Sequence, residues 1–126
     1  MITIKRNTTP TLPIVVEVPF ENIRKIEFVF KRKIDPTSPA LVKRKYSIDS
    51  AEGIPIREGE DNSKEFTVLM KLKAKETAEL LAGESYMDTL IVFKDGTIPD
   101  TEIIPAKIKE TLFMEVYDDD EGENQE

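Results

Sequence analysis

Apolar and polar residues alternate along most of this chain, and this period of two is what most constrains its fold. Residues 26–30 read IEFVF and residues 66–72 read FTVLMKL, so every second side chain is apolar. Successive side chains of a β-strand point to opposite faces, whereas a helix repeats every 3.6 residues. The pattern therefore predicts half-buried strands, each with one face toward a core.

The strands occur at short, even intervals, with turn residues between them. The interval favours an all-β, immunoglobulin-like antiparallel sandwich of about seven strands, although a barrel has the same signature. Pro10 and Pro13 mark the first strand as an edge strand, because proline cannot donate to a ladder, and Asp95-Gly96 is a hairpin signal. The predicted strands are residues 11–18, 23–33, 41–48, 66–72, 87–94, 97–104 and 106–116, with a connection at 49–64 that holds at most a short edge strand.

One short helical turn interrupts the strands. Residues 74–82 read AKETAELLA, a run of good helix formers. Gly83 follows and is predicted to cap the C-terminal end of this helix. A single helical segment does not support repeated βαβ units.

Composition excludes several kinds of catalytic site. The chain has no cysteine and no histidine, so thiol nucleophiles, zinc thiolate sites and Ser-His-Asp triads cannot be built. We therefore expect no enzyme activity, no cofactor and no bound metal.

Charge divides the chain into two parts. Residues 118–126 hold six acids and no base, so the rest carries a net charge of only −1 out of a total of −7. We predict a β-sandwich domain over residues 1–117 and a disordered acidic tail over 118–126. A nearly neutral body does not favour nucleic-acid binding, and neither a signal peptide nor a membrane span is expected.

The segment from Leu72 to Asp88 has the most specific pattern. In immunoglobulin-type sandwiches a tyrosine packs at a strand-to-strand corner and its hydroxyl bonds the upstream backbone. Here Leu72 ends one strand, Glu76 and Thr77 lie on the helical turn, and Tyr86 opens the next strand. We predict that Leu72, Glu76, Thr77, Gly83, Tyr86 and Asp88 form a structural corner.

This pattern resembles the small immunoglobulin-like sandwich domains of phages and prophages of Gram-positive bacteria, in particular the N-terminal domain of the baseplate upper protein. The similar pieces are residues 26–30, the Leu72–Asp88 spacing and the Lys94-Asp95-Gly96-Thr97 run, over residues 22–116. Lys73 departs from the family, which has threonine there, and the 49–64 connection is longer and more charged.

The resemblance implies a non-catalytic structural component of a phage or prophage particle, of the tail or baseplate type. Its partners would be other phage structural proteins and further copies of itself. It would be made in the bacterial cytoplasm and then built into the virion. Exposed strand edges, such as residues 11–18, would be its docking elements. The alternative is a ligand- or carbohydrate-binding accessory sandwich of a bacterial cell-surface system.

Four groups of residues have both a structural and a functional interpretation. Glu76 and Asp88 are either turn and capping groups or a carboxylate pair for catalysis, and Tyr86 is either a core residue or a ligand contact. Lys31, Lys33, Lys43 and Lys45 either protect exposed strands or contact an acidic partner. The acidic tail is either a solvating segment or a calcium site, and it is also a candidate to dock on these lysines, in its own subunit or another. The predicted core comprises Ile26, Phe28, Phe30, Tyr46, Phe66, Val68, Met70, Leu72, Tyr86, Ile91, Phe93, Ile108 and Phe113.

Overall fold

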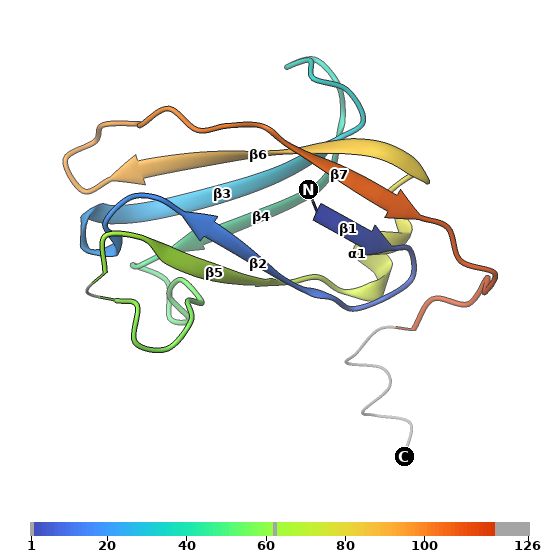
Figure 1. The fold of residues 1–126 in the computed structure, drawn as a ribbon, viewed down its shortest axis with the longest axis horizontal. Coiled ribbons are helices and arrows are strands. Elements are labelled where there is room, and N and C mark those ends of the chain that lie inside the picture. Colours follow the sequence, from blue (N-terminus) through green and yellow to red (C-terminus); the bar gives the residue numbers. More distant parts are fainter. Residues whose placement is uncertain (1, 62, 118–126) are drawn as a thin grey trace.

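The predicted all-β architecture is confirmed in the computed structural model, which describes residues 2–61 and 63–117 (Figure 1). The acidic tail, with its predicted disorder, calcium and docking roles, lies outside the described residues. Over the described ranges the chain forms seven strands, a five-residue α-helix and a short 3-10 helix. These elements are β1 (Ile2–Lys5), β2 (Thr11–Val16), η1 (Phe20–Asn22), β3 (Ile23–Lys31), β4 (Ala40–Ser47), β5 (Phe66–Lys71), α1 (Ala74–Ala78), β6 (Gly83–Phe93) and β7 (Ile104–Lys109).

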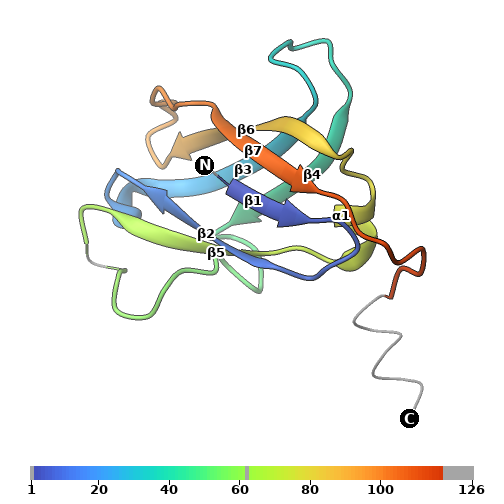
Figure 2. The ribbon, with the colours of Figure 1, turned by 45° about the vertical axis from the view of Figure 1, so that its right-hand side comes forward.

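Two sheets face each other across the core (Figures 1 and 2). In the described chain, one sheet has five strands in the order β1-β7-β6-β3-β4, and the other pairs β2 with β5. All pairings are antiparallel except β1 with β7, which is parallel. The third, sixth and seventh strands share one sheet and the second and fifth share the other, which is the strand distribution of an immunoglobulin-like sandwich.

The alternating residues fill the core as the sequence predicts. Inward-facing side chains of β3 are buried at Ile26, Phe28 and Phe30, while Glu27 and Val29 between them face outward. The Phe28 and Tyr46 rings pack edge to face, with centroids 6.3 Å apart. Of the predicted core, the fully buried members are Ile26, Phe28, Phe30, Phe66, Val68, Met70, Leu72, Ile91 and Ile108, and Tyr46 and Phe93 are partly buried against it.

Two predicted strands and one predicted core residue are wrong. The chain at 97–103 forms no strand, although the turn at Asp95-Gly96 exists and the Phe93 amide donates to the Thr97 carbonyl at 2.9 Å. The last strand ends at Lys109, because its partner β6 begins at Gly83, opposite Ile108. Beyond that point no strand of the described chain remains to pair with, so Phe113 is 71% exposed and not in the core.

The sequence pattern missed β1. Its four residues pair in parallel with β7, from Ile2 beside Ala106 to Lys5 beside Lys109. The connection at 49–64 contributes a single bridge, Ile56 beside Val68, rather than a strand.

Candidate functional site

Glu76 anchors the corner that leads from β5 to β6. Its carboxylate accepts the Lys73 backbone amide at 2.9 Å and a hydrogen bond from the Arg44 guanidinium. Arg44 also donates to the Lys71 carbonyl at 3.1 Å, so one arginine of β4 links the end of β5 to α1. A carboxylate at the start of a helix satisfies an amide that the helix leaves free. Glu76 therefore has the structural role that the sequence predicted.

Thr77 links the same corner to the N-terminal turn. Its side chain is fully buried, and its hydroxyl donates to the Thr8 carbonyl at 2.8 Å and accepts the Thr8 amide at 3.0 Å. Leu72, also fully buried, donates its amide to the Pro10 carbonyl at 3.0 Å. The corner residues thus hold the chain between β1 and β2, which passes from one sheet to the other.

Gly83 and Tyr86 do not have the corner roles that the pattern predicts. The helix ends at Ala78, and Gly83 opens β6 instead of capping α1. Tyr86 lies between buried Ser85 and buried Met87 on the strand, so its half-buried side chain is on the outer face. The expectation of a core tyrosine is therefore wrong, because strand alternation places Ser85 inward and Tyr86 outward.

Asp88 also lies on the outer face of β6, opposite Val29 of β3. Glu76, in contrast, meets Arg44, which shares the inner face of β4 with Val42. The two carboxylates therefore lie on opposite faces of the sheet and do not form a catalytic pair. The Asp88 carboxylate accepts the Thr89 backbone amide at 2.8 Å.

The two basic triplets belong to one β-hairpin, but they are not directly opposite one another. Lys45 pairs with Glu27 and Lys43 with Val29, whereas Lys31 pairs with Ala40 near the loop. Lys31, Lys43 and Lys45 share the outer face. The Lys31 ammonium donates to the Pro36 carbonyl at 2.9 Å, and the Lys45 ammonium lies 3.4 Å from the Glu27 carboxylate.

The loop between β3 and β4 forms a groove with this outer face. The groove, of about 370 Å³, also contacts the segment before β7. The Thr37 amide and hydroxyl both donate to the Asp35 carboxylate at 2.9 Å, and these two bonds order the loop. They also hold the pKa of the Asp35 carboxyl below its ordinary value. The lining residues are Val29, Lys31, Lys33, Ile34, Asp35, Pro36, Tyr86, Asp88 and Ile103.

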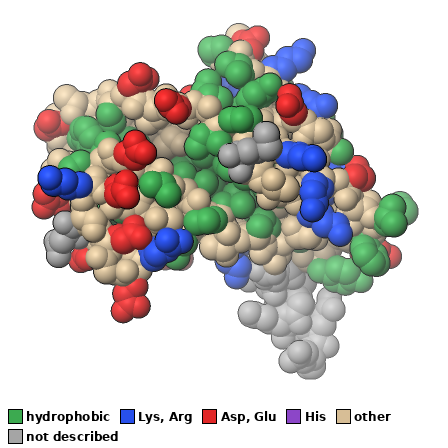
Figure 3. All heavy atoms as spheres, viewed as in Figure 1, with side chains coloured by type: hydrophobic (Ala, Val, Ile, Leu, Met, Phe, Trp, Pro, Cys, Tyr) green, Lys and Arg blue, Asp and Glu red, His purple; other side chains and the backbone are tan. Residues whose placement is uncertain are grey.

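A larger hollow lies on the other side of the five-stranded sheet, between β2 and β6. It has a volume of about 500 Å³ and a mixed lining. The buried side chains of Ile14, Val16 and Ile91 lie in its walls, together with the carboxylates of Glu17, Asp100 and Glu102 and the hydroxyls of Thr89 and Thr101. Figure 3 shows hydrophobic side chains gathered in this hollow near the centre of the face. Nothing in the local sequence pattern predicts the hollow, because its walls come from segments far apart in the chain.

The hollow lies beside an unpaired strand edge. β2 pairs with β5 and with no other strand of residues 2–61 and 63–117. The Leu72 amide bonds to Pro10, and antiparallel alternation then points the backbone groups of Thr11, Pro13 and Val15 away from β5. The edge position predicted from the prolines is confirmed. The nitrogen of Pro13, which carries no hydrogen, faces the open edge and not β5, so the pairing of β2 with β5 loses no hydrogen bond.

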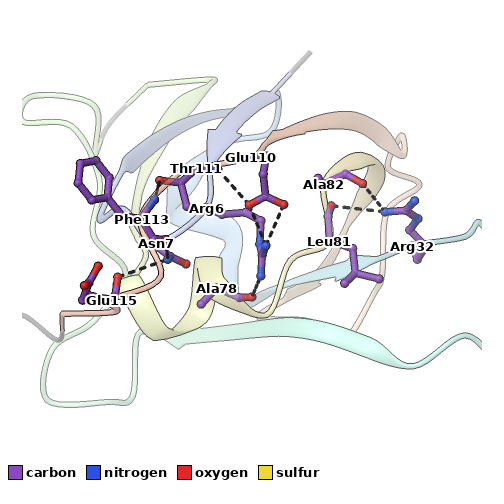
Figure 4. Close-up of polar contacts among 10 residues, drawn as sticks. All are labelled: Arg6, Asn7, Arg32, Ala78, Leu81, Ala82, Glu110, Thr111, Phe113 and Glu115. Carbon is purple, nitrogen blue, oxygen red and sulfur yellow. Dashed lines mark hydrogen bonds and ion pairs between the residues drawn. The ribbon is translucent and has the colours of Figure 1, made fainter.

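The chain after β7 is exposed although it is apolar. Leu112 is 99% exposed and Met114 91% exposed. The Asn7 side-chain amide donates to the Phe113 carbonyl at 3.0 Å and to the Glu115 carbonyl at 3.4 Å, as Figure 4 shows.

Arg6 fixes the approach to this segment, whereas Arg32 binds the chain between α1 and β6. Arg6 donates to the Glu110 carboxylate at 2.8 Å and to the Ala78 carbonyl at 2.9 Å, and Arg32 donates to the Ala82 carbonyl at 3.0 Å (Figure 4). The Thr111 amide and the Arg6 guanidinium hold the pKa of the Glu110 carboxyl below its ordinary value. The contacts of Arg6 hold the end of β7 against α1.

Within the described residues no group of three or more His, Cys, Asp or Glu side chains is arranged to hold a metal ion. No helix in that part of the chain has the length and apolar character needed to cross a membrane.

Comparison with known proteins finds similarity of fold alone. No family model and no curated protein matches the chain. One solved structure comes from work on multimeric cell-adhesive interactions of voltage-gated sodium channel β subunits; it has a TM-score of 0.41 and 12% identity and covers 87% of this chain and 89% of that one. Another, an extracellular domain of the sodium channel β4 subunit, has a TM-score of 0.35 and 13% identity, over 88% of this chain and 91% of that one. At these values the comparisons say nothing about what this chain binds.

Proposed function

We propose that this chain is a non-catalytic structural module of a phage or prophage particle, of the tail or baseplate type, that docks on other chains through the open edge of β2. The observation that carries the proposal is the outer backbone edge of β2, which no strand of the described residues pairs with, beside a hollow of about 500 Å³. A free edge accepts an extended segment by backbone hydrogen bonds, and pockets beside the edge select its side chains.

The resemblance to phage sandwich domains supports the particle role. The open backbone of β2 suits an extended protein segment better than a sugar, because it offers a row of main-chain groups for strand pairing. The groove beside Tyr86 is the observation that favours the alternative, a ligand-binding accessory domain, because an aromatic side chain there is partly accessible.

The experiment is to follow the chain through particle assembly in the bacterium that carries its gene. After prophage induction, particles are purified on a density gradient and the chain is quantified in them by mass spectrometry. We expect it to co-purify with tail proteins in a fixed ratio. Its absence from intact particles would overturn the particle role.

Two surface variants locate the docking site. Val15→Lys adds a charge beside the free edge at a side chain that is 58% exposed, so the fold is unaffected. Ile34→Lys is the matched control, because Ile34 is 63% exposed on the loop beside the groove. We expect Val15→Lys to be lost from particles and Ile34→Lys to remain. The reverse result would assign docking to the groove instead.

A further inference from the structure

We infer that the open edge of β2 is filled by the segment 112–117 of a second copy of this chain. This inference rests on the proposed function, since it names the occupant of the same edge. It starts from two surfaces of one molecule. The edge of β2 beside the hollow is paired with no further strand of the described residues, and the apolar side chains of the segment are covered by no described sheet.

The segment has the sequence of a strand with one apolar face. Residues 112–117 read LFMEVY, and Leu112, Met114 and Val116 fall on the same side of an extended chain. In the protomer Leu112 and Met114 are almost completely exposed, and Phe113 and Tyr117 are 71% and 69% exposed. An exposed apolar segment of this kind marks an interaction site.

The length and backbone of the segment match the edge that would receive it. β2 has six residues, the same number as the segment. In an antiparallel pairing that opposes Val16 with Leu112, the side chains of Leu112 and Met114 lie over the hollow beside Val16 and Ile14. Glu115 then lies opposite Pro13, where the edge offers a carbonyl and no amide.

Charge selects the antiparallel direction. The carboxylates in the lining of the hollow, Glu17, Asp100 and Glu102, lie near the end of β2. Acidic residues begin at Asp118, directly after the segment. An antiparallel strand carries them toward the start of β2, whereas a parallel strand would place them against Glu17.

The segment cannot reach the hollow of its own protomer while β7 stays paired. β7 runs from Ile104, which lines the hollow, to Lys109, five steps of about 3.3 Å each or roughly 16 Å away. Leu112 is three residues further on, which gives a reach of about 10 Å. The Arg6–Glu110 ion pair also holds the end of β7 (Figure 4). The donor is therefore another copy.

Cysteine cross-linking in the 126-residue chain tests the pairing, and this sequence has no cysteine to interfere. In the proposed register, Val15 of one copy lies opposite Phe113 of the other as a hydrogen-bonded pair. The Cα atoms of such a pair are about 5.5 Å apart, a distance that a disulfide can bridge. A Val15→Cys protein is mixed with a size-tagged Phe113→Cys protein under mild oxidation. We expect the mixed dimer to be the main product.

The control mixes Val15→Cys with Tyr117→Cys, which lies on the same face of the segment but four residues away. We expect little mixed dimer there. Cross-linking through Tyr117 in place of Phe113 would overturn the antiparallel register. Absence of both products, together with a monomeric mass by light scattering, would overturn the inference itself.

A second test needs no cysteine. The double variant Leu112→Asp/Met114→Asp changes side chains that are exposed in the protomer, so its circular dichroism spectrum should match the parent. We expect its solution mass to fall to that of the monomer, while Ile34→Asp, a charge at another exposed apolar residue, keeps the oligomer. An unchanged mass in the double variant would contradict strand donation.

The outcomes separate this inference from the proposed function. Chains that enter particles but do not cross-link would retain the particle role and rule out the second copy as the occupant. Chains that cross-link but never enter particles would retain strand donation and rule out the particle role.

Discussion

The hydroxyl of Thr77 should contribute measurably to stability, and replacing it with a methyl group tests this. Thr77→Val keeps the shape of the side chain and removes the hydroxyl, which donates to the Thr8 carbonyl at 2.8 Å and accepts the Thr8 amide at 3.0 Å. Both Thr8 groups then lose their partner. Each buried group left unpaired costs about 1–3 kcal/mol.

Thr8 is only half-buried, so water partly replaces the lost bonds and we expect a total of about 2 kcal/mol. For a domain of this size that corresponds to a fall of about 8 °C in Tm. The assay is urea unfolding followed by circular dichroism, combined with hydrogen exchange of the Thr8 amide. Exchange at Thr8 should become faster, because that amide depends on the hydroxyl.

Thr77→Ser is the matched control, because it keeps the hydroxyl and loses a buried methyl worth about 0.8 kcal/mol. We expect the valine variant to be less stable than the serine variant, although valine is the more apolar residue. A valine variant as stable as the parent would refute the reasoning that this hydroxyl links the corner to the N-terminal turn.

Three further predictions concern β6 and the end of β7. Gly83→Ala should lower the free energy of unfolding by about 1–3 kcal/mol, because Gly83 has a φ of 110° that a side chain disfavours; an unchanged denaturant midpoint would contradict this. Ser85→Ala should be neutral or stabilise by up to about 1 kcal/mol, because the buried Ser85 hydroxyl has no hydrogen-bond partner in the described chain; a clear loss of stability would reveal a partner. The Thr111 amide and the Arg6 guanidinium lower the pKa of Glu110. The ionised Glu110 carboxylate therefore stabilises the folded state above the ordinary carboxyl pKa. This stabilisation is lost as the pH falls through the lowered pKa. The difference in Tm between the parent and Glu110→Gln should therefore shrink between neutral pH and about pH 3, and a difference that grew toward acid would have the wrong sign.

Strand alternation was readable from the sequence wherever one face of a strand meets the core. Ile26, Phe28 and Phe30 are buried as predicted. A shift of the β3 pairing register by one residue would turn all three side chains to the outer face, so burial of the apolar face fixes the register. The edge position of β2 was also readable from the sequence. Proline has no amide hydrogen to donate to a second neighbouring strand, so it indicates a strand at the edge of a sheet.

Local signals failed where a partner far along the chain decides the outcome. Good helix formers continue to Ala82, yet α1 ends at Ala78 and Leu80 is fully buried in the core. The tyrosine spacing suggested a core corner, whereas the sheet places Ser85 inward and Tyr86 outward. The apolar run that includes Phe113 continues past the end of β6, so no partner strand of the described chain covers it.

The candidate sites divide in the same way. Glu76 could be assigned to a corner from the sequence, because one of its partners, the Lys73 amide, is only three residues away. The bonds from Thr77 to Thr8 and from Glu76 to Arg44 join segments far apart in the chain, and only the structure shows them. The hollow beside β2 could not be assigned, because its walls come from β2, β6 and the segment before β7.

The sequence by itself therefore determined that this chain is all-β, that β2 is an edge strand, and that cysteine and histidine chemistry is absent. The tertiary structure alone decided that β1 joins β7 and leaves the edge of β2 open over the core. The reason is physical: the side-chain period of a strand is local, whereas the choice of a neighbouring strand is a competition among segments distant in the chain.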